Sequence, residues 1–113
     1  MRVLVCGSRH FQNYELLKET LNAYSITSII HGCARGGDTL AGQYGREMGI
    51  PISEFPAQWD TFGRRAGSIR NAQMLREGRP EMVVAFRGPN SRGTQNMIDQ
   101  ATKAGVEVRI IDV

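Results

Sequence analysis

Three glycine-rich polar clusters, each directly after a short apolar run, carry the residues of this chain that are best suited to bind a ligand. Glycine lets a backbone approach a ligand closely and adopt a positive φ without steric cost. Where such a cluster opens a helix, the unpaired amides of the first turn attract phosphate or carboxylate groups. The residues that we predict to contact a ligand are Gly7, Ser8 and Arg9 in the first cluster, Gly32, Arg35, Gly36, Gly37 and Asp38 in the second, and Gly88, Ser91, Gly93 and Thr94 in the third.

Two side chains of these clusters lie where a helix is expected to begin. Asp38 either caps or flanks the start of the following helix, or accepts a hydrogen bond from a ribose hydroxyl. Ser91 is placed to cap a helix whose first turn contains Gly93 and Thr94, where a hydroxyl and two free amides would hold a phosphate. The glycine spacing by itself is weak support, because it matches neither G-x-G-x-x-G nor a Walker A motif.

Arginine dominates the basic residues and favours an anionic partner. Of 14 lysines and arginines only Lys18 and Lys103 are lysine, and the formal net charge is +3. The arginine side chain offers a rigid planar fork that matches phosphate and carboxylate groups. This bias does not distinguish a nucleotide from a nucleic acid. The arginines in or near the segments that we place at the ligand site are Arg9, Arg35, Arg64, Arg65, Arg70, Arg87 and Arg92.

The connection over residues 56–63 is longer than the others, and we expect it to lie as a flap over the ligand site. It contains Trp59, the only tryptophan, which either anchors a surface loop or stacks on a flat ligand. The helix expected after it begins with small residues and would turn Arg70 and Asn71 toward the same site.

No residues have the arrangement of a nucleophile with a base or of a general acid with a base. His10 and His31 are the only histidines, and each is assigned a structural or ligand-bonding role. Cys6 and Cys33, without companion histidines, are expected to be buried or half-buried free thiols and not metal ligands. The sequence therefore predicts no metal site and no required cofactor, and it leaves open whether any reaction is catalysed.

The elements that must position these residues alternate along the whole chain. Apolar runs near residues 2–6, 27–31, 51–55, 81–86 and 106–111 are typical of strands, and the stretches between them have helical spacing. This alternation predicts a single α/β, Rossmann-like, three-layer domain over residues 1–113. We expect a five-stranded parallel sheet of order 3-2-1-4-5 with helices on both faces, so that all three glycine-rich clusters emerge at one edge. Gly49 and Gly105 fall where helices should end.

The overall composition is that of an ordinary globular domain, with 41% hydrophobic and 22% charged residues. No apolar stretch approaches the roughly 20 residues that cross a bilayer. No signal-peptide pattern precedes the first strand-like run. We therefore expect a cytoplasmic protein with no membrane partner, and the sequence leaves homo-oligomer formation open.

Five motifs in this order resemble one known group of domains. They are Gly7-Ser8-Arg9, residues 31–41, Trp59, Ala66-Gly67-x-x-Arg70-Asn71, and Ala85-Phe86-Arg87-Gly88 with Gly93-Thr94. Over essentially the whole chain, they resemble the YspA-like, cpYpsA-related branch of the SLOG superfamily. SLOG domains are Rossmann-like, and the superfamily includes DprA proteins, LOG phosphoribohydrolases and domains that sense nucleotide or NAD-derived signals. The resemblance implies a nucleotide-type ligand at the strand edge and no established reaction.

One departure from the LOG enzymes bears on catalysis. Those enzymes carry P-G-G-x-G-T-x-x-E after the fourth strand, and the closing glutamate serves catalysis. Met97 stands at that position here, and the preceding glycine pair is replaced, while Gly93 and Thr94 remain. The resemblance therefore implies a phosphate-holding segment without the LOG catalytic acid.

The favoured interpretation is a domain that binds a nucleotide or an ADP-ribose-like molecule and acts as a sensor, carrier or sequestering protein. One alternative is a hydrolase or transferase acting on a nucleotide, in which Asp38, Asp60 or His31 would replace the missing glutamate. The other is a DprA-like protein that binds single-stranded DNA. Nucleic acid is the less favoured partner, because no basic groove with several interleaved aromatic residues is evident.

Overall fold

The computed structural model describes all 113 residues and contains one wholly parallel five-stranded sheet in the order β3-β2-β1-β4-β5. The predicted strand order and direction are confirmed. The strands are β1 Arg2–Gly7, β2 Ser28–His31, β3 Ile52–Glu54, β4 Met82–Arg87 and β5 Glu107–Asp112. The helices are α1 Tyr14–Asn22, α2 Gly37–Met48, α3 Trp59–Phe62, α4 Ala66–Gln73 and α5 Arg92–Lys103, with a 3-10 turn η1 Gly63–Arg65 and a π turn η2 Met74–Gly78 on either side of α4.

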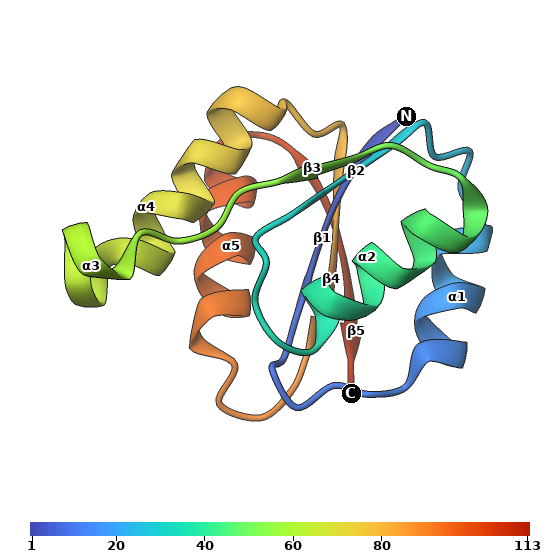
Figure 1. Cartoon of the computed structure of the whole chain (residues 1–113), viewed down its shortest axis with the longest axis horizontal. Coiled ribbons are helices and arrows are strands. Elements are labelled where there is room, and N and C mark those ends of the chain that lie inside the picture. The colour runs from blue at the N-terminus through green and yellow to red at the C-terminus, as the bar shows by residue number, and fades with distance from the viewer.

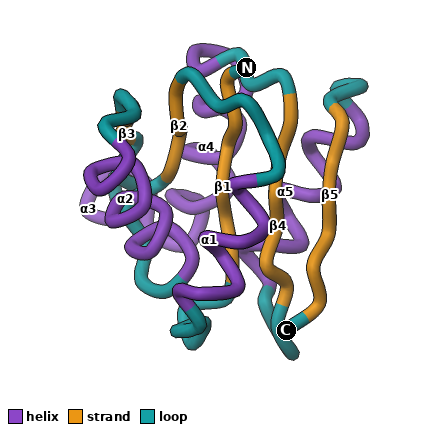
Figure 2. The backbone as a smooth tube through the Cα atoms, turned by 90° about the vertical axis from the view of Figure 1, so that its right-hand side faces the viewer, coloured by secondary structure: helices purple, strands orange, loops and turns teal.

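Helices cover both faces of the sheet, as the alternation of elements predicts. Figure 1 shows α1 and α2 on one side of the sheet and α4 and α5 on the other. Figure 2 shows the five strands side by side, with β1 at the centre between β2 and β4. Strands covered on both faces bury successive side chains, and this explains the unbroken apolar runs of β1 and β4.

Each face of the sheet has its own hydrophobic cluster. On one face Val5 packs with Leu17 of α1 and Tyr44 of α2. On the other face Leu4 packs with Met97 of α5. Because side chains of one strand alternate between the faces, β1 contributes to both clusters and fixes the helices relative to the sheet. Every helix of the chain is too short or not apolar enough to cross a membrane.

The ends of two helices agree with the sequence prediction. Gly49 follows α2 with a φ of 68°, and Gly105 lies just beyond α5 with a φ of 77°. These left-handed conformations suit glycine and end the helices before β3 and β5. All five strands then run in the same direction, and their carboxyl ends meet at the end of the sheet that carries the C-terminus in Figures 1 and 2.

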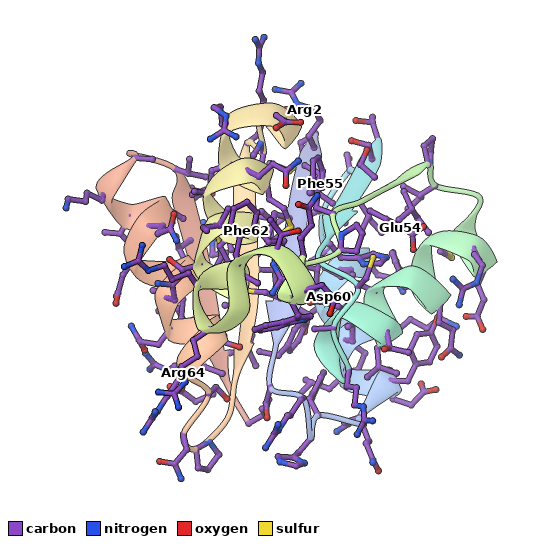
Figure 3. The ribbon with its side chains drawn as sticks, turned by 60° about the vertical axis from the view of Figure 1, so that its left-hand side comes forward. Arg2, Glu54, Phe55, Asp60, Phe62 and Arg64 are labelled. Carbon is purple, nitrogen blue, oxygen red and sulfur yellow. The ribbon has the colours of Figure 1, made fainter.

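The connection over residues 56–63 is not the open loop that the sequence indicates. Its second half forms the short helix α3, which lies beside α4 in Figure 3 with Asp60 and Phe62 on it. Phe62 is 42% exposed and Trp59 is 58% exposed. The segment is therefore an exposed helical turn attached to α4.

Candidate ligand-binding cleft

The three glycine-rich clusters meet at the carboxyl edge of the sheet, where their backbones touch. A side chain added to Gly37 would lie 2.7 Å from the Cα atom of Gly7. One added to Gly36, whose φ is 77°, would lie 2.0 Å from the Ser8 carbonyl oxygen. One added to Gly88 would lie 2.9 Å from the Cβ atom of Ser8. Only glycine fits at such approaches, and the three loops therefore form one continuous surface.

A polar cleft of about 600 Å³ lies between the β1–α1 loop and the β4–α5 loop. It contains three groups that carry or can gain positive charge, on Arg9, His10 and Arg92, and no carboxylate. A concave surface with charges of one sign concentrates ligands of the opposite sign. The full lining is Gly7, Ser8, Arg9, His10, Pro89, Asn90, Ser91, Arg92 and Thr94.

The first turn of α5 presents unpaired donors at this cleft. Ser91 occupies the N-cap position, as predicted, but its hydroxyl oxygen accepts a hydrogen bond from the Gly88 amide at 3.0 Å and caps no helix amide. The amides of Gly93 and Thr94 consequently have no acceptor within the chain. A Cβ added to Gly93 would meet nothing within 4 Å, so the backbone there is open to a ligand.

The β2–α2 loop has the opposite character, because its polar groups bond to each other. The buried Asp38 carboxylate accepts hydrogen bonds from the amides of Gly32 and Ala34, each at 3.1 Å, through the same oxygen. Burial raises the pKa of Asp38 to about 6, against the lowering effect of these amides and of Arg70. The carboxylate thus organises its own loop, and a ribose contact would have to use its second oxygen.

Arg70 and Asn71 link this loop to the rest of the edge. The Arg70 guanidinium donates to the Gly32 carbonyl at 2.5 Å and to the Asn71 side-chain oxygen at 3.0 Å. The buried Asn71 amide donates to the Gly93 carbonyl at 3.3 Å and to Asn96 at 3.0 Å. Together the two residues connect the β2–α2 loop through α4 to the first turn of α5. Neither lines the 600 Å³ cleft, and both remain predicted, untested ligand contacts.

The other predicted residues do not line this cleft. Arg35 is exposed on the β2–α2 loop, and Trp59 packs near Gly67 of α4. Arg87 is held by Asp112 at 2.7 Å and by Gln95 at 3.1 Å. Of the seven arginines singled out in the sequence, only Arg9 and Arg92 line the cleft. The expected flap contributes no residue to it either.

Sequence reasoning did not select four cleft residues as ligand contacts: His10, Pro89, Asn90 and Arg92, the last of which it placed only near the site. Each is adjacent to a selected residue within the same loop, so its place in that loop could have predicted it as a ligand contact. Asn90 also has a φ of 58°, a conformation that only a few non-glycine residues adopt readily. That conformation belongs to the turn that delivers Ser91 to the start of α5.

The two cysteines differ from each other. Cys6 is buried in β1, and burial raises the pKa of its thiol far above the usual range. Cys33 is exposed, so the prediction that both thiols are at least half-buried is wrong for this residue. It lies in the loop directly after β2 and has a φ of 62°.

Comparison with known proteins agrees with this architecture. The YspA, cpYpsA-related SLOG family matches residues 1–62, which contain the first two glycine-rich loops. The chain is also similar to the Gene 61 protein of Mycobacterium phage D29, with 32% identity over 118 aligned residues that cover 95% of this chain and 93% of the phage protein. The matched family, the parallel sheet and the glycine-rich edge together place the chain: it belongs to the YspA, cpYpsA-related SLOG family.

Proposed function

We propose that this protein binds a phosphate-bearing small molecule, a nucleotide or an ADP-ribose-like compound, in the cleft between the β1–α1 and β4–α5 loops. The observation that carries the proposal is a pair of unpaired amides in the first turn of α5, that of Gly93 and that of Thr94, of which Thr94 lines the cleft together with Arg9 and Arg92. Amides of a first helical turn and arginine side chains are the groups that proteins use for phosphates.

The size and charge of the cleft suit this class of ligand. Small-molecule sites commonly have volumes of about 300–1,000 Å³, and the cleft has about 600 Å³. Its lining contains no hydrophobic residue, which favours a highly polar ligand over an apolar one. A second hollow of about 400 Å³ adjoins it through Ser8, His10 and Pro89. It adds the apolar side chains of Phe11 and Leu16 and the Asp112 carboxylate, which is held by Arg87. In this proposal a phosphate lies at α5 and the remainder of the ligand extends toward α1.

Binding without turnover is the activity that we favour for this cleft. Its lining has no carboxylate, and His10 carries its only imidazole. Met97 of α5, which replaces the LOG catalytic glutamate in the motif comparison, is fully buried against the sheet. A role as sensor, carrier or sequestering protein therefore requires fewer unexplained groups than hydrolysis of a nucleotide does.

Calorimetric titration with ADP-ribose, AMP and inorganic phosphate tests the proposal. We expect Arg9→Ala and Arg92→Ala to weaken binding of ADP-ribose about tenfold each, since a hydrogen bond to a charged group contributes roughly 1.5–3 kcal/mol. Arg109→Ala is the matched control, because Arg109 is an exposed arginine of β5 that lies 3.5 Å from Glu107. Absence of binding by all three compounds at millimolar concentration would overturn the proposal.

A single-stranded oligonucleotide provides the comparison with a DNA-binding function. Affinity that depends on several phosphate contacts falls steeply with salt, with a logarithmic slope of about −0.7 per contact for single strands. We expect weak oligonucleotide binding that is lost near physiological salt. Tight binding under those conditions would rank the DNA-binding alternative first.

A further inference from the structure

A second cluster of chemically capable side chains lies on β2 and β3, away from the 600 Å³ cleft. His31 is the last residue of β2 and pairs in register with Glu54, the last residue of β3. Cys33 follows two residues later, and its left-handed backbone carries the thiol back toward Glu54. Figure 3 shows Glu54 at the outer edge of the sheet beside α2. Three different donor types, nitrogen, sulfur and oxygen, therefore meet at one place.

The distances within this cluster match the spacing of ligands around a small metal ion. The His31 Nε2 atom lies 3.7 Å from the Glu54 Oε2 atom, and the Cys33 Sγ atom lies 3.8 Å from the same oxygen. All three donor atoms lie within 4.8 Å of one another. Tetrahedral zinc with bonds of 2.0–2.3 Å separates neighbouring donor atoms by about 3.3–3.7 Å. Shifts of a few tenths of an ångström to about one ångström would bring the three side chains to that geometry.

We propose that His31, Cys33 and Glu54 bind a divalent transition-metal ion of the zinc class, with the fourth coordination position open to solvent. The donor set of one imidazole, one thiolate and one carboxylate is one that zinc accepts and that magnesium and calcium do not favour. His31 is buried and held in place, whereas Cys33 and Glu54 are exposed and give the ion a path from solvent.

Binding of the ion moves one proton on His31 and releases one proton from Cys33. The Cys33 amide donates to His31 Nδ1 at 3.0 Å, so neutral His31 carries its proton on Nε2. Binding at Nε2 moves that proton to Nδ1, and the Cys33 amide gives up this hydrogen bond. The Cys33 thiol releases its proton to solvent as the metal–sulfur bond forms, as metal binding to thiols requires.

The groups around the cluster affect the ion in opposite directions. Gly42 of α2 faces the imidazole, and a Cβ atom there would lie 3.2 Å from Nε2, so a larger residue at this position would crowd the nitrogen that binds the ion. Arg46, one turn further along α2, brings a positive charge close to the imidazole and opposes a cation. The negative charges of Glu54 and of the Cys33 thiolate compensate for it when metal is bound.

There is a physical reason why the sequence did not indicate this site. The sequence analysis expected both cysteines to be free thiols without companion histidines, and Cys6, which is buried in β1, indeed takes no part. The actual partners are a histidine two residues away in the chain and a glutamate 21 residues from Cys33, brought in by strand pairing.

The test uses the full chain after treatment with a chelator and measures Co²⁺ absorption and Zn²⁺ competition against a coloured chelator. We expect one ion per chain, a sulfur-to-cobalt charge-transfer band, and weakening of Zn²⁺ binding by tenfold or more in Cys33→Ser and in Glu54→Gln. Both variants change exposed side chains, and thermal unfolding checks that they fold. His10→Gln, which removes the histidine of the other cleft, should leave the absorption and the affinity unchanged.

Two results would overturn the metal site: cobalt binding without a charge-transfer band, or unchanged Zn²⁺ affinity in Cys33→Ser. Neither result bears on the phosphate-binding cleft, because the titrations contain no nucleotide and the metal ligands do not line that cleft.

Discussion

The β2–α2 loop and the β4–α5 loop have similar glycine-rich sequences and opposite hydrogen-bonding states. In the β2–α2 loop, the amides of Gly32 and Ala34 bond to Asp38, and the Gly32 carbonyl accepts from Arg70. In the β4–α5 loop, the amides of Gly93 and Thr94 have no acceptor in the chain. Glycine content alone therefore does not identify a ligand-binding loop, and the partners of the loop's own amides decide what it can bind.

The largest effect expected from this difference is on stability. Asp38→Ala removes the acceptor of two amides and leaves the buried Gly32 amide unpaired, so the free energy of unfolding should fall by about 3 kcal/mol. Chemical denaturation measures the change. Asp60→Ala, which removes an exposed carboxylate from α3, is the control and should change stability little. A stable Asp38→Ala variant would contradict a structural role for this loop.

The pH dependence of stability sharpens the same comparison. Burial raises the pKa of Asp38 to about 6, so the folded protein binds this proton more tightly than the unfolded chain does. The contribution of Asp38 to stability should therefore decrease as pH rises from about 4 to about 6, by about 2 kcal/mol in all. Asp38→Asn keeps an oxygen acceptor and should remove this part of the pH dependence. A wild-type profile that coincides with that of Asp38→Asn would show that the carboxyl titrates normally.

In the β4–α5 loop we expect the smallest change in stability but a clear change in ligand affinity. Thr94→Val keeps the shape of this nearly buried residue and removes its hydroxyl at the cleft. We expect ADP-ribose binding to weaken about tenfold, equivalent to about 1.4 kcal/mol, with little change in the unfolding midpoint. Thr94→Ser retains the hydroxyl and should bind nearly as the wild type does. Equal affinity of Thr94→Val and the wild type would remove this hydroxyl from the ligand site.

The sequence predicted the architecture well because local patterns determine it. Apolar runs such as that of β4 and helix-ending glycines such as Gly49 depend on their immediate neighbours, and the parallel order follows from the alternation of elements. The meeting of the three glycine-rich clusters at one edge follows from that order. The structure bears out the order and the meeting of the clusters.

The state of individual side chains could not be predicted, because it depends on contacts between distant parts of the chain. Arg70 has the appearance of a free ligand-binding arginine in the sequence, yet its guanidinium bonds to Gly32, 38 residues away. Arg87 is likewise held by Asp112, 25 residues away. The helical form of α3 was missed because a four-residue helix has too few positions to show a periodic pattern.

Backbone amide chemical shifts, recorded while ADP-ribose is titrated into the labelled protein, test the central claim most directly. Both loops contain glycine amides, so each loop reports separately on the same titration. We predict the largest shifts at Gly93 and Thr94, with smaller shifts at Gly32 and Ala34, whose amides already bond to Asp38. Large shifts at Gly32 and Ala34 with unchanged Gly93 and Thr94 would contradict the claim that the β4–α5 loop holds the phosphate.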